Sequence, residues 1–250
     1  AAKLFRAKVT AEPHNTTASL HLFKALQNAG AVRDEPGPVG ETERIPRQVF
    51  QFWDRELPPA LADLRERNRA LNPGYAYHLF DKVRARAYLE DRGGTALTRA
   101  FRRAPHPAAM SDIFRLAVLY HEGGLYMDPD DRCVAPLADH LDHGLRFIGY
   151  QEYLWSIGYN FLAVAPRDPI IGAALREVEE AFSSGHGETL WLSTGPGLMT
   201  RALAAHGGSA DGALPDDIWI MPAHRLRRFV SSHVSLPYKS SDQHWTKAIR

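Results

Sequence analysis

The stretch that most constrains the fold is residues 45–80, where two short apolar segments flank an amphipathic one. Residues 47–53 (RQVFQFW) are rich in β-forming side chains, residues 59–71 (PALADLRERNRAL) have helical apolar spacing, and residues 75–80 (YAYHLF) alternate like a second strand. The turn signal NPGY separates the helix from the second strand. Strand, helix and strand in this order form the unit of a parallel sheet, so the pattern predicts an α/β fold.

The same alternation continues toward the C-terminus. Further helices are predicted at residues 82–94, 95–104, 108–124, 167–182 and 195–208, and further strands at 125–127, 145–150, 160–165 and 218–221. Residues 16–30 have the pattern of a helix that begins at a Thr or Ser cap and stops at Gly30, and residues 33–44 are typical of a linker. We therefore expect an N-terminal arm over residues 1–44 and a single domain over residues 45–250.

Composition excludes several classes of function. The chain has 30 Lys and Arg against 29 Asp and Glu, a formal net charge of +1, so no overall field attracts nucleic acid. No segment reaches the roughly 18 apolar residues that a membrane-spanning helix needs. The single cysteine, Cys133, allows no intramolecular disulfide and fits a reducing compartment. We expect a cytoplasmic protein, with a peripheral position at a membrane as the alternative; the oligomeric state stays open.

Carboxylates gather directly after the strand predicted at 125–127, in the stretch HEGGLYMDPDD. Asp128 and Asp130 flank Pro129 at the carboxyl end of that strand, where open α/β sheets bind ligands. Two carboxylates at this spacing can bind one hard divalent cation. Because no Cys pair or His-x-x-x-His lies nearby, we expect Mg²⁺ or Mn²⁺ rather than zinc. The alternative interpretation is a solvated acidic turn, since Asp and Pro are common turn residues.

A second charged pair lies upstream of these carboxylates. Asp112 and Arg115 are three residues apart on the helix predicted at 108–124, so they share one face of it. The rest of that helix is apolar and is expected to be buried. The pair either forms a structural ion pair or points into the same cleft as Asp128, where it would hydrogen-bond the hydroxyl groups of a polar ligand.

These segments together resemble a known family. IPRQVFQFW, NPGYAYHLFD and SDIFRLAVLYHEGGLYMDPD are similar, in order and spacing, to the DXD-containing sugar-binding glycosyltransferases. That family includes yeast-type initiating α-1,6-mannosyltransferases and bacterial capsular polysaccharide transferases, and it is related to the glucosyltransferase domains of large clostridial toxins. The resemblance is strong over residues 45–137 and looser beyond. It implies a GT-A fold, with a Rossmann-like, mostly parallel central sheet flanked by helices over residues 45–250 and an N-terminal helical arm.

The resemblance also implies a reaction, the retaining transfer of a hexose from a UDP- or GDP-sugar donor to a hydroxyl of a glycan, lipid-linked or small-molecule acceptor. In the family pattern, Trp53 would stack on the nucleotide base, with Phe52 beside it as a further donor contact. Asp112 and Arg115 match the pair that holds the transferred sugar and the ribose, and Asn160 matches a position that lines the sugar site. Asp112, Arg115 and Asn160 are therefore the expected catalytic residues.

The family pattern also assigns the cofactor, Mn²⁺ or Mg²⁺. Asp130 would ligate the metal directly, and Asp128 would contact the ribose or the metal through water. In the C-terminal DQHWTKAIR, His244 and Trp245 match the region that closes over the diphosphate, with His244 as a metal ligand and Trp245 as a donor contact. Lys239 or His244 would help to neutralise the leaving group.

Two rival functions remain open at this point. A metal-dependent phosphohydrolase would use the same carboxylates to activate water, and a non-catalytic module would bind the nucleotide sugar without turnover. Two other segments have two interpretations each. TGPG at 194–197 is either an anion-facing helix start or a turn, and Arg225, Arg227 and Arg228 are expected to form a solvated face rather than an acceptor-phosphate patch.

Overall fold

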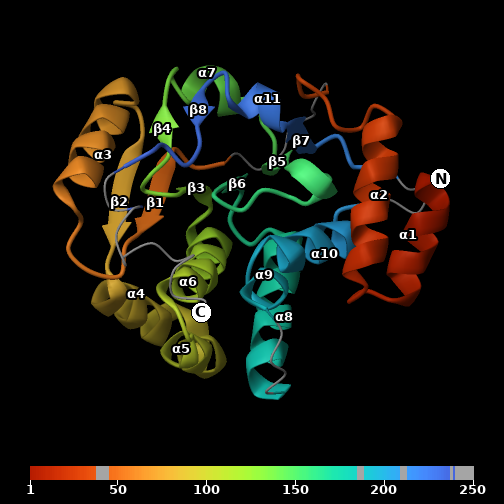
Figure 1. Cartoon of the computed structure of the whole chain (residues 1–250), viewed down its shortest axis with the longest axis horizontal. Helices are drawn as coiled ribbons and strands as arrows, with labels where there is room; N and C mark the ends of the chain where they lie inside the picture. The colour runs from red at the N-terminus through yellow and green to blue at the C-terminus, as the bar shows by residue number, and fades with distance from the viewer. Residues whose placement is uncertain (38–44, 185–188, 209–212, 237–238, 240–250) are drawn as a thin grey trace.

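The computed structural model describes residues 1–37, 45–184, 189–208, 213–236 and 239. Its centre is a six-stranded sheet with the order β2-β1-β3-β6-β5-β7 (Figure 1). The strands are β1 (Gln48–Phe52), β2 (Ala76–Phe80), β3 (Gly124–Met127), β5 (Phe147–Gln151), β6 (Phe161–Val164) and β7 (Ile218–Pro222). All pairs are parallel except those of β6, which runs antiparallel between β3 and β5. The predicted mostly parallel α/β sheet is confirmed.

This topology brings segments from all six strands to one end of the sheet, which we call the carboxyl end. Strands β1, β2, β3, β5 and β7 finish there, and the antiparallel β6 begins there. Trp53 follows β1, and its backbone N–H donates to Phe80 O at the end of β2 (2.9 Å). Asp128 follows β3, and its N–H donates to Asn160 O just before β6 (2.9 Å). Residues far apart in the sequence therefore meet at the carboxyl end.

Helices and a short ribbon cover the two faces of the sheet (Figure 1). One face packs against α5 (Gly94–Arg103), α6 (Pro107–Glu122), α8 (Pro169–Ser184) and α10 (Pro196–His206) in the larger apolar core. The other face packs against α7 (Ala138–Leu141), α11 (Ala223–Leu226) and the antiparallel ribbon of β4 (Arg132–Cys133) and β8 (Val230–Ser231). Helix α3 (Pro59–Leu71) packs on β4. Cys133 is buried among apolar side chains.

The junction between α6 and β3 needs glycine at two successive positions. Gly123 has φ +65° and Gly124 has φ +102°, both in the left-handed region that favours glycine. Both also lie against backbone, because a Cβ at Gly123 would meet Pro166 N at 2.6 Å and one at Gly124 would meet Gln48 O at 2.8 Å. The helix passes into the strand without a loop, which holds the charged face of α6 rigidly beside the end of β3.

The N-terminal arm packs on the body of the molecule. It consists of α1 (Ala2–Ala11) and α2 (Thr16–Asn28), which contact each other and α10. Leu22, Phe23 and Leu26 of α2 are buried in the larger core. The predicted Thr or Ser cap of α2 is wrong, because Asn15 Oδ1 accepts from Ala18 N (2.8 Å) and caps the helix instead.

Other elements differ from the predicted boundaries in small ways. The two helices predicted over residues 82–104 form a continuous path of α4 (Lys82–Tyr88), a π-helical turn (Leu89–Gly93) and α5. A short helix, α9 (Leu190–Ser193), precedes α10. Asp168 caps α8, since its Oδ1 accepts from Ile170 N (2.8 Å). None of the described helices combines the length and apolarity that crossing a membrane requires.

Candidate functional site

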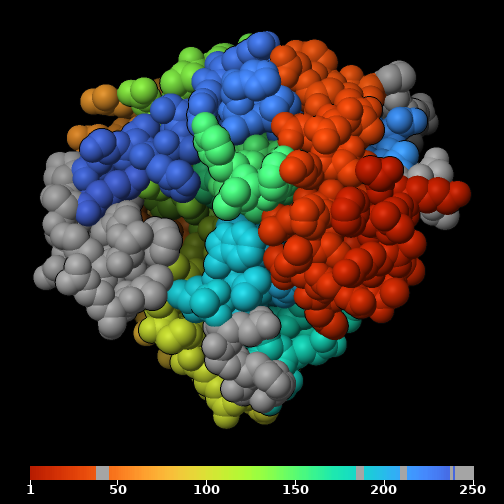
Figure 2. All heavy atoms as spheres, turned by 45° about the vertical axis from the view of Figure 1, so that its right-hand side comes forward, coloured from red at the N-terminus to blue at the C-terminus, as the bar shows by residue number. Residues whose placement is uncertain are grey.

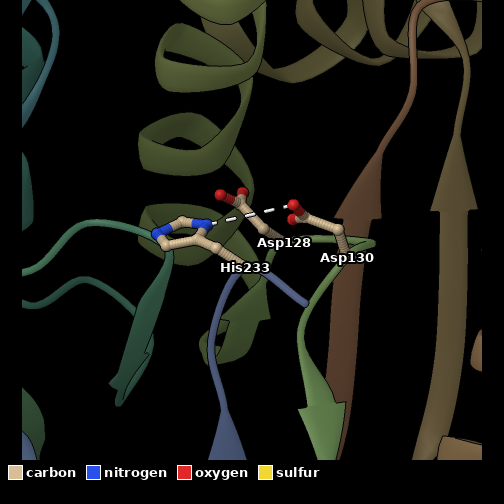
Figure 3. Close-up of side chains that lie close together, drawn as sticks. All are labelled: Asp128, Asp130 and His233. Atoms are coloured by element: carbon tan, nitrogen blue, oxygen red, sulfur yellow. Dashed lines mark ion pairs between the residues drawn. The ribbon is translucent and has the colours of Figure 1, made fainter. Parts of the chain in front are cut away.

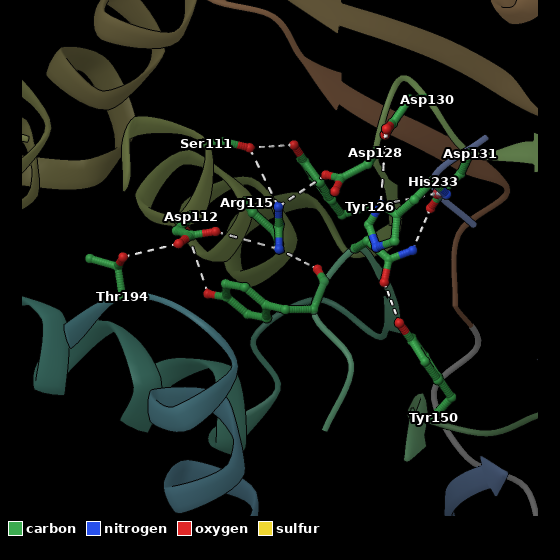
Figure 4. Close-up of polar contacts among 12 residues, drawn as sticks. Ser111, Asp112, Arg115, Tyr126, Asp128, Asp130, Asp131, Tyr150, Thr194 and His233 are labelled. Carbon is green, nitrogen blue, oxygen red and sulfur yellow. Dashed lines mark hydrogen bonds and ion pairs between the residues drawn. The ribbon is translucent and has the colours of Figure 1, made fainter. Parts of the chain in front are cut away.

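A buried guanidinium group stands at the centre of the carboxyl end. Arg115, on α6, is only 4% exposed, and one of its terminal nitrogens lies 3.1 Å from Asp128 Oδ1 and the other 3.5 Å from Asp112 Oδ1. Its plane lies over the rings of Tyr126 and Tyr159, 4.2 Å from each centroid (Figure 4). The ion-pair interpretation of Asp112 and Arg115 is confirmed, and Arg115 also reaches the carboxylate after β3; contact of the pair with a polar ligand stays a prediction.

Asp112 is the second charged group of this face of α6. Its Oδ2 accepts a hydrogen bond from Thr194 Oγ1 (2.9 Å), which places the predicted TGPG segment against α6 (Figure 4). Burial raises the pKa of Asp112 to about 7, against the opposing effects of Arg115 and of the Thr194 hydroxyl. A carboxyl group in this position changes its charge near neutral pH, so its ability to accept hydrogen bonds depends on pH.

The turn after β3 assembles a possible cation site with a histidine from the C-terminal part of the chain. One ligand atom each from Asp128, Asp130 and His233 lies within 4.8 Å of the others, and all three side chains converge from two loops (Figure 3). His233 Nδ1 is 3.9 Å from Asp130 Oδ2, and Lys239 Nζ is 2.5 Å from the same oxygen. Burial raises the pKa of Asp128 to about 6, and Arg115 opposes that shift.

Behind this turn, a third carboxylate holds the loops together. Asp131 is fully buried; its Oδ1 accepts from the backbone N–H of His233 (2.8 Å) and its Oδ2 accepts from Asn160 Nδ2 (2.6 Å). The Oδ1 of Asn160 in turn accepts from the hydroxyl of Tyr150 (Figure 4). Asn160 therefore lies next to the acidic turn, with its amide engaged in this network; its expected place in a sugar site stays a prediction.

The two aromatic residues assigned to the donor base have different surroundings. Trp53 is half-buried at the carboxyl end, directly after β1. Phe52 is buried in the larger core, where its ring packs against Phe101 and Phe114 at centroid distances of 6.2 and 5.9 Å. Phe52 thus packs the end of β1 onto the larger core, and Trp53 is the one of the two that is partly exposed at the surface.

The structure separates the remaining predicted residues into three groups. His244 and Trp245 lie outside the described residues, so their expected roles stay predictions. Lys239 joins the site through Asp130, as its assignment to the leaving group requires. The prediction of a solvated face is wrong for Arg225, which is buried and donates to the backbone oxygen of Asp34 (2.8 Å). Arg225 is buried because the chain segment that follows α2 passes over α11.

Sequence reasoning missed His233 and Asp131. The two residues are 102 positions apart, and they meet because β4 pairs with β8, Arg132 opposite Ser231. Asp131 was visible as the last carboxylate of DPDD. The two-residue strand at 230–231 is too short to give a periodic signal, so nothing local indicated that His233 would face the acidic turn.

Comparison with known sequences agrees with this geometry. Residues 58–151 match the family model described as a glycosyltransferase sugar-binding region containing the DXD motif. Inositol phosphoceramide mannosyltransferase 1 of Schizosaccharomyces pombe is 26% identical over 174 residues, which are 66% of this chain and 53% of that protein. The mannosyl phosphorylinositol ceramide synthase SUR1 of Saccharomyces cerevisiae is 25% identical over 172 residues, 64% of this chain and 42% of that protein. The chain thus spans about half the length of the curated relatives it matches.

Comparison with solved structures addresses the fold. The PaToxG glycosyltransferase superposes with a TM-score of 0.55 and 19% identity, over 75% of this chain and 77% of that chain. At this identity the likeness establishes a common GT-A fold and no shared substrate. The sequence match, the relatives and the fold together confirm the family resemblance: residues 58–151 match the sugar-binding region of the DXD-containing glycosyltransferases, and the fold is GT-A.

Proposed function

We propose that this chain is a metal-dependent retaining glycosyltransferase, which moves a hexose from a nucleoside-diphosphate sugar to an acceptor hydroxyl. One observation carries the proposal: Arg115 links Asp112 on α6 to the first carboxylate of the DXD turn, beside a possible cation site. Retention of the anomeric configuration rests on the family resemblance. The names of the relatives indicate mannosyl transfer to inositol phosphoceramide, so GDP- and UDP-hexoses are the donors to test.

The residues at the acidic turn fit a divalent cation. Asp128 and Asp130 offer carboxylate oxygens and His233 offers an imidazole nitrogen. Carboxylates suit both Mg²⁺ and Mn²⁺, but an imidazole ligand favours a transition metal, so we assign Mn²⁺ first. A cation bound here would neutralise the charge that develops on the leaving diphosphate. Lys239, at 2.5 Å from Asp130, shows that this carboxylate already attracts a positive group.

The chain's own groups would position the donor. Trp53 would stack on the base at the carboxyl end of β1. Asp112 would accept a hydrogen bond from a hydroxyl of the transferred sugar and stabilise positive charge on the sugar ring, by analogy with glycoside cleavage. Arg115 has its Cζ 4.2 Å from the ring centres of Tyr126 and Tyr159, and its nitrogens are shared between two carboxylates. We therefore assign it the task of holding Asp112 and Asp128 at a fixed separation as well as contacting the donor.

The acceptor would approach from the side of the β5–β6 connection, since the donor occupies the ends of β1 and β3. Asn160 and Tyr150 border that side. Because Asp131 ties Asn160 to the DXD turn, a movement of Asn160 on the acceptor side would also shift the carboxylates of the cation site.

Thermal-shift measurements with UDP, GDP, CDP and ADP test the donor and the cation together, because a ligand that binds only the folded state raises the melting temperature. Wild type, Asp130→Asn and the matched control Asp63→Asn, an exposed aspartate on α3, are each melted with Mn²⁺, Mg²⁺ or EDTA. We expect one diphosphate to stabilise wild type and the control only with metal, and Asp130→Asn to lose that shift. Equal behaviour of all three proteins under every condition would refute the proposal.

Turnover separates the proposed reaction from its rivals. With the matching hexose donor and an acceptor, a glycosyltransferase releases the nucleoside diphosphate and joins the hexose to the acceptor. Release of inorganic phosphate would instead indicate the hydrolase, and a metal-dependent nucleotide shift without turnover on any acceptor would indicate the binding module. NMR of the first product reports the anomeric configuration, and inversion would contradict the retaining mechanism.

A further inference from the structure

The connection between β5 and β6 carries an exposed apolar tip beside the candidate site. We call residues Tyr153, Leu154 and Trp155 the hairpin tip; they form a 3₁₀ turn. Tyr153 is 86% exposed and Leu154 is 74% exposed, the highest values among the large apolar side chains of the described part of the chain. Exposing two adjacent apolar side chains to water to this extent is unfavourable in free energy, and the surfaces of soluble proteins normally avoid it.

The hairpin tip is held rigidly. At its base Glu152 N donates to Ser156 O (2.8 Å) and Gly158 N donates to Tyr150 O (2.8 Å), which closes the connection as a β-hairpin. One step further in, Ile157 N donates to Thr200 Oγ1 on α10 (2.9 Å). Because these bonds tie the hairpin to the body at its base, the exposed side chains do not belong to a loosely placed loop.

The backbone of the hairpin tip is strained. Leu154 has φ +62° and Trp155 has φ +64°, so two successive residues other than glycine occupy the left-handed region. A Gly or Asn at position 154 would remove that strain. Among the described residues, the exposed leucine makes no packing contacts that would offset it. Strain held by a rigid frame is common where a segment contacts a ligand or partner.

Charge at the hairpin tip has a definite arrangement. The exposed Lys24 of α2 places its ammonium group 4.3 Å from the centre of the Trp155 ring. Glu152, the carboxylate nearest in sequence, accepts hydrogen bonds from Tyr150 (2.9 Å) and Ser156 (3.4 Å), both at the base of the hairpin. The apex is therefore apolar and aromatic, with a cation beside it.

The hairpin tip also has a position of consequence. Figure 2 shows the light green segment around residue 150 at the rim of a hollow, between the cyan segment of α9 and α10 and the blue segment of β8. The same hairpin carries Tyr150, which is bonded to Asn160 next to the DXD turn. Whatever the hairpin tip contacts thus lies beside the entrance to the candidate site.

We propose that the hairpin tip inserts into the surface of a lipid bilayer and holds the mouth of the site against it. An exposed tyrosine and leucine at the apex, with Lys24 beside the half-buried Trp155 that packs on the core, match the residue types that sit at membrane–water interfaces. A protein partner of standard affinity needs several hundred square ångströms from each side, far more than a two-residue apex offers, whereas each side chain that enters a bilayer contributes on its own. The proposal goes beyond the reaction and stands whether or not the donor assignment does.

Vesicle co-sedimentation tests the proposal with the full chain and no donor. The vesicles are phosphatidylcholine alone and phosphatidylcholine with phosphatidylserine. The test variant is Tyr153→Ser/Leu154→Asn, which keeps a residue that tolerates the left-handed backbone at 154. The matched control is Val83→Ser, which removes another exposed apolar side chain (65% exposed) on α4. We expect wild type and the control to bind, more tightly with phosphatidylserine, and the test variant to bind roughly tenfold more weakly.

Two further measurements on the same proteins make the outcome unambiguous. The metal-dependent nucleotide shift in melting temperature should be equal in the test variant and wild type, so a failure of the donor assignment is seen separately from a failure of membrane binding. Equal vesicle binding by the test variant and wild type, or no binding by wild type, would overturn the proposal. A wild-type dimer in sedimentation velocity that the test variant loses would also overturn it, by making the hairpin tip an interface between two copies of the chain.

Discussion

Asp112 shows how a single buried residue can link the stability of this protein to its chemistry. Its carboxyl group lies on an apolar helix, where the loss of water disfavours the charged form, while Arg115 and Thr194 favour it. The balance raises its pKa to about 7. The group that we propose as the acceptor for a sugar hydroxyl is thus only partly ionised at neutral pH in the ligand-free protein.

The first prediction concerns the pH dependence of stability. Between about pH 4 and pH 7 the folded chain keeps the Asp112 proton that the unfolded chain has lost, so its contribution to stability falls as pH rises through this window. Asp112→Asn removes that dependence. Relative to wild type, we expect the variant to gain stability between pH 4 and pH 7, by about 1 kcal/mol for each pH unit of this window. Urea unfolding at both pH values measures it, with Asp63→Asn as control; a pH-independent difference would contradict the assignment.

Asp131 gives a second prediction at this scale. Asp131→Ala leaves two donors, the partly buried His233 N and the buried Asn160 Nδ2, without their acceptor. Each unpaired group costs about 1–3 kcal/mol, so we expect a loss of roughly 2–5 kcal/mol in the free energy of unfolding. Mn²⁺ should also bind more weakly, because His233 is no longer held beside Asp130. Urea unfolding and calorimetry with Mn²⁺ check the two effects, and a variant that loses stability but binds Mn²⁺ like wild type would rule out the positioning role.

These residues also show what the sequence could predict about the site. Asp112 and Arg115 were predictable as a pair, because a three-residue spacing on a helix puts side chains on one face. Asp128 and Asp130 were predictable from the strand that precedes them. His233 was not, since its place depends on a ribbon between segments 102 residues apart in which each strand has two residues. Contacts made by such short pairings leave no periodic pattern.

At the scale of elements, the α6–β3 junction carries the third prediction. Gly124→Ala must place a Cβ 2.8 Å from Gln48 O while keeping φ near +102°. Gly144 is the matched control, because its φ is +68° but a Cβ there meets no atom within 4 Å. We expect Gly144→Ala to cost about 1 kcal/mol, from backbone conformation alone, and Gly124→Ala to cost at least about twice that. Equal losses of stability for the two variants in thermal unfolding would mean that the close approach of position 124 to β1 does not contribute to the cost.

The hairpin tip leads to a fourth prediction, with the opposite sign. Leu154→Asn should stabilise the fold by about 1 kcal/mol, because asparagine tolerates the left-handed conformation that leucine holds at φ +62°. Little apolar burial is lost, since the leucine is mostly exposed. Chemical denaturation of the single variant measures the gain. An unchanged or lower free energy of unfolding would show that the leucine makes contacts that offset its strain.

For the whole molecule, the strand order was harder to predict than the strands themselves. Alternating strands and helices predicted a parallel sheet, and five strands do share a direction. The reversal of β6 depends on the hairpin connection that follows β5, residues 152–160, which also carries the exposed tip. The packing of the N-terminal arm was equally invisible, because an amphipathic helix shows which of its faces is buried but not what covers that face.

The last prediction tests whether the arm and the body unfold as one unit. Phe23 of α2 is fully buried in the larger core, whereas Trp219 of β7 is fully buried in the core on the opposite face of the sheet. Phe23→Ala should cost about 3–5 kcal/mol, while the matched control Leu4→Ala, with its side chain 71% exposed on α1, should cost no more than about 0.5 kcal/mol.

If the arm is integral, the Phe23→Ala loss is shared by the whole molecule. Tryptophan fluorescence, which includes Trp219, and circular dichroism, which includes the helices of the arm, should then move to the same lower midpoint in urea, as coincident probes do in a two-state transition. An early loss of helical signal with an unchanged fluorescence midpoint would instead make the arm a separate unit docked on a body that is stable without it. The packing of Leu22 and Leu26 beside Phe23 in the larger core argues for the single transition.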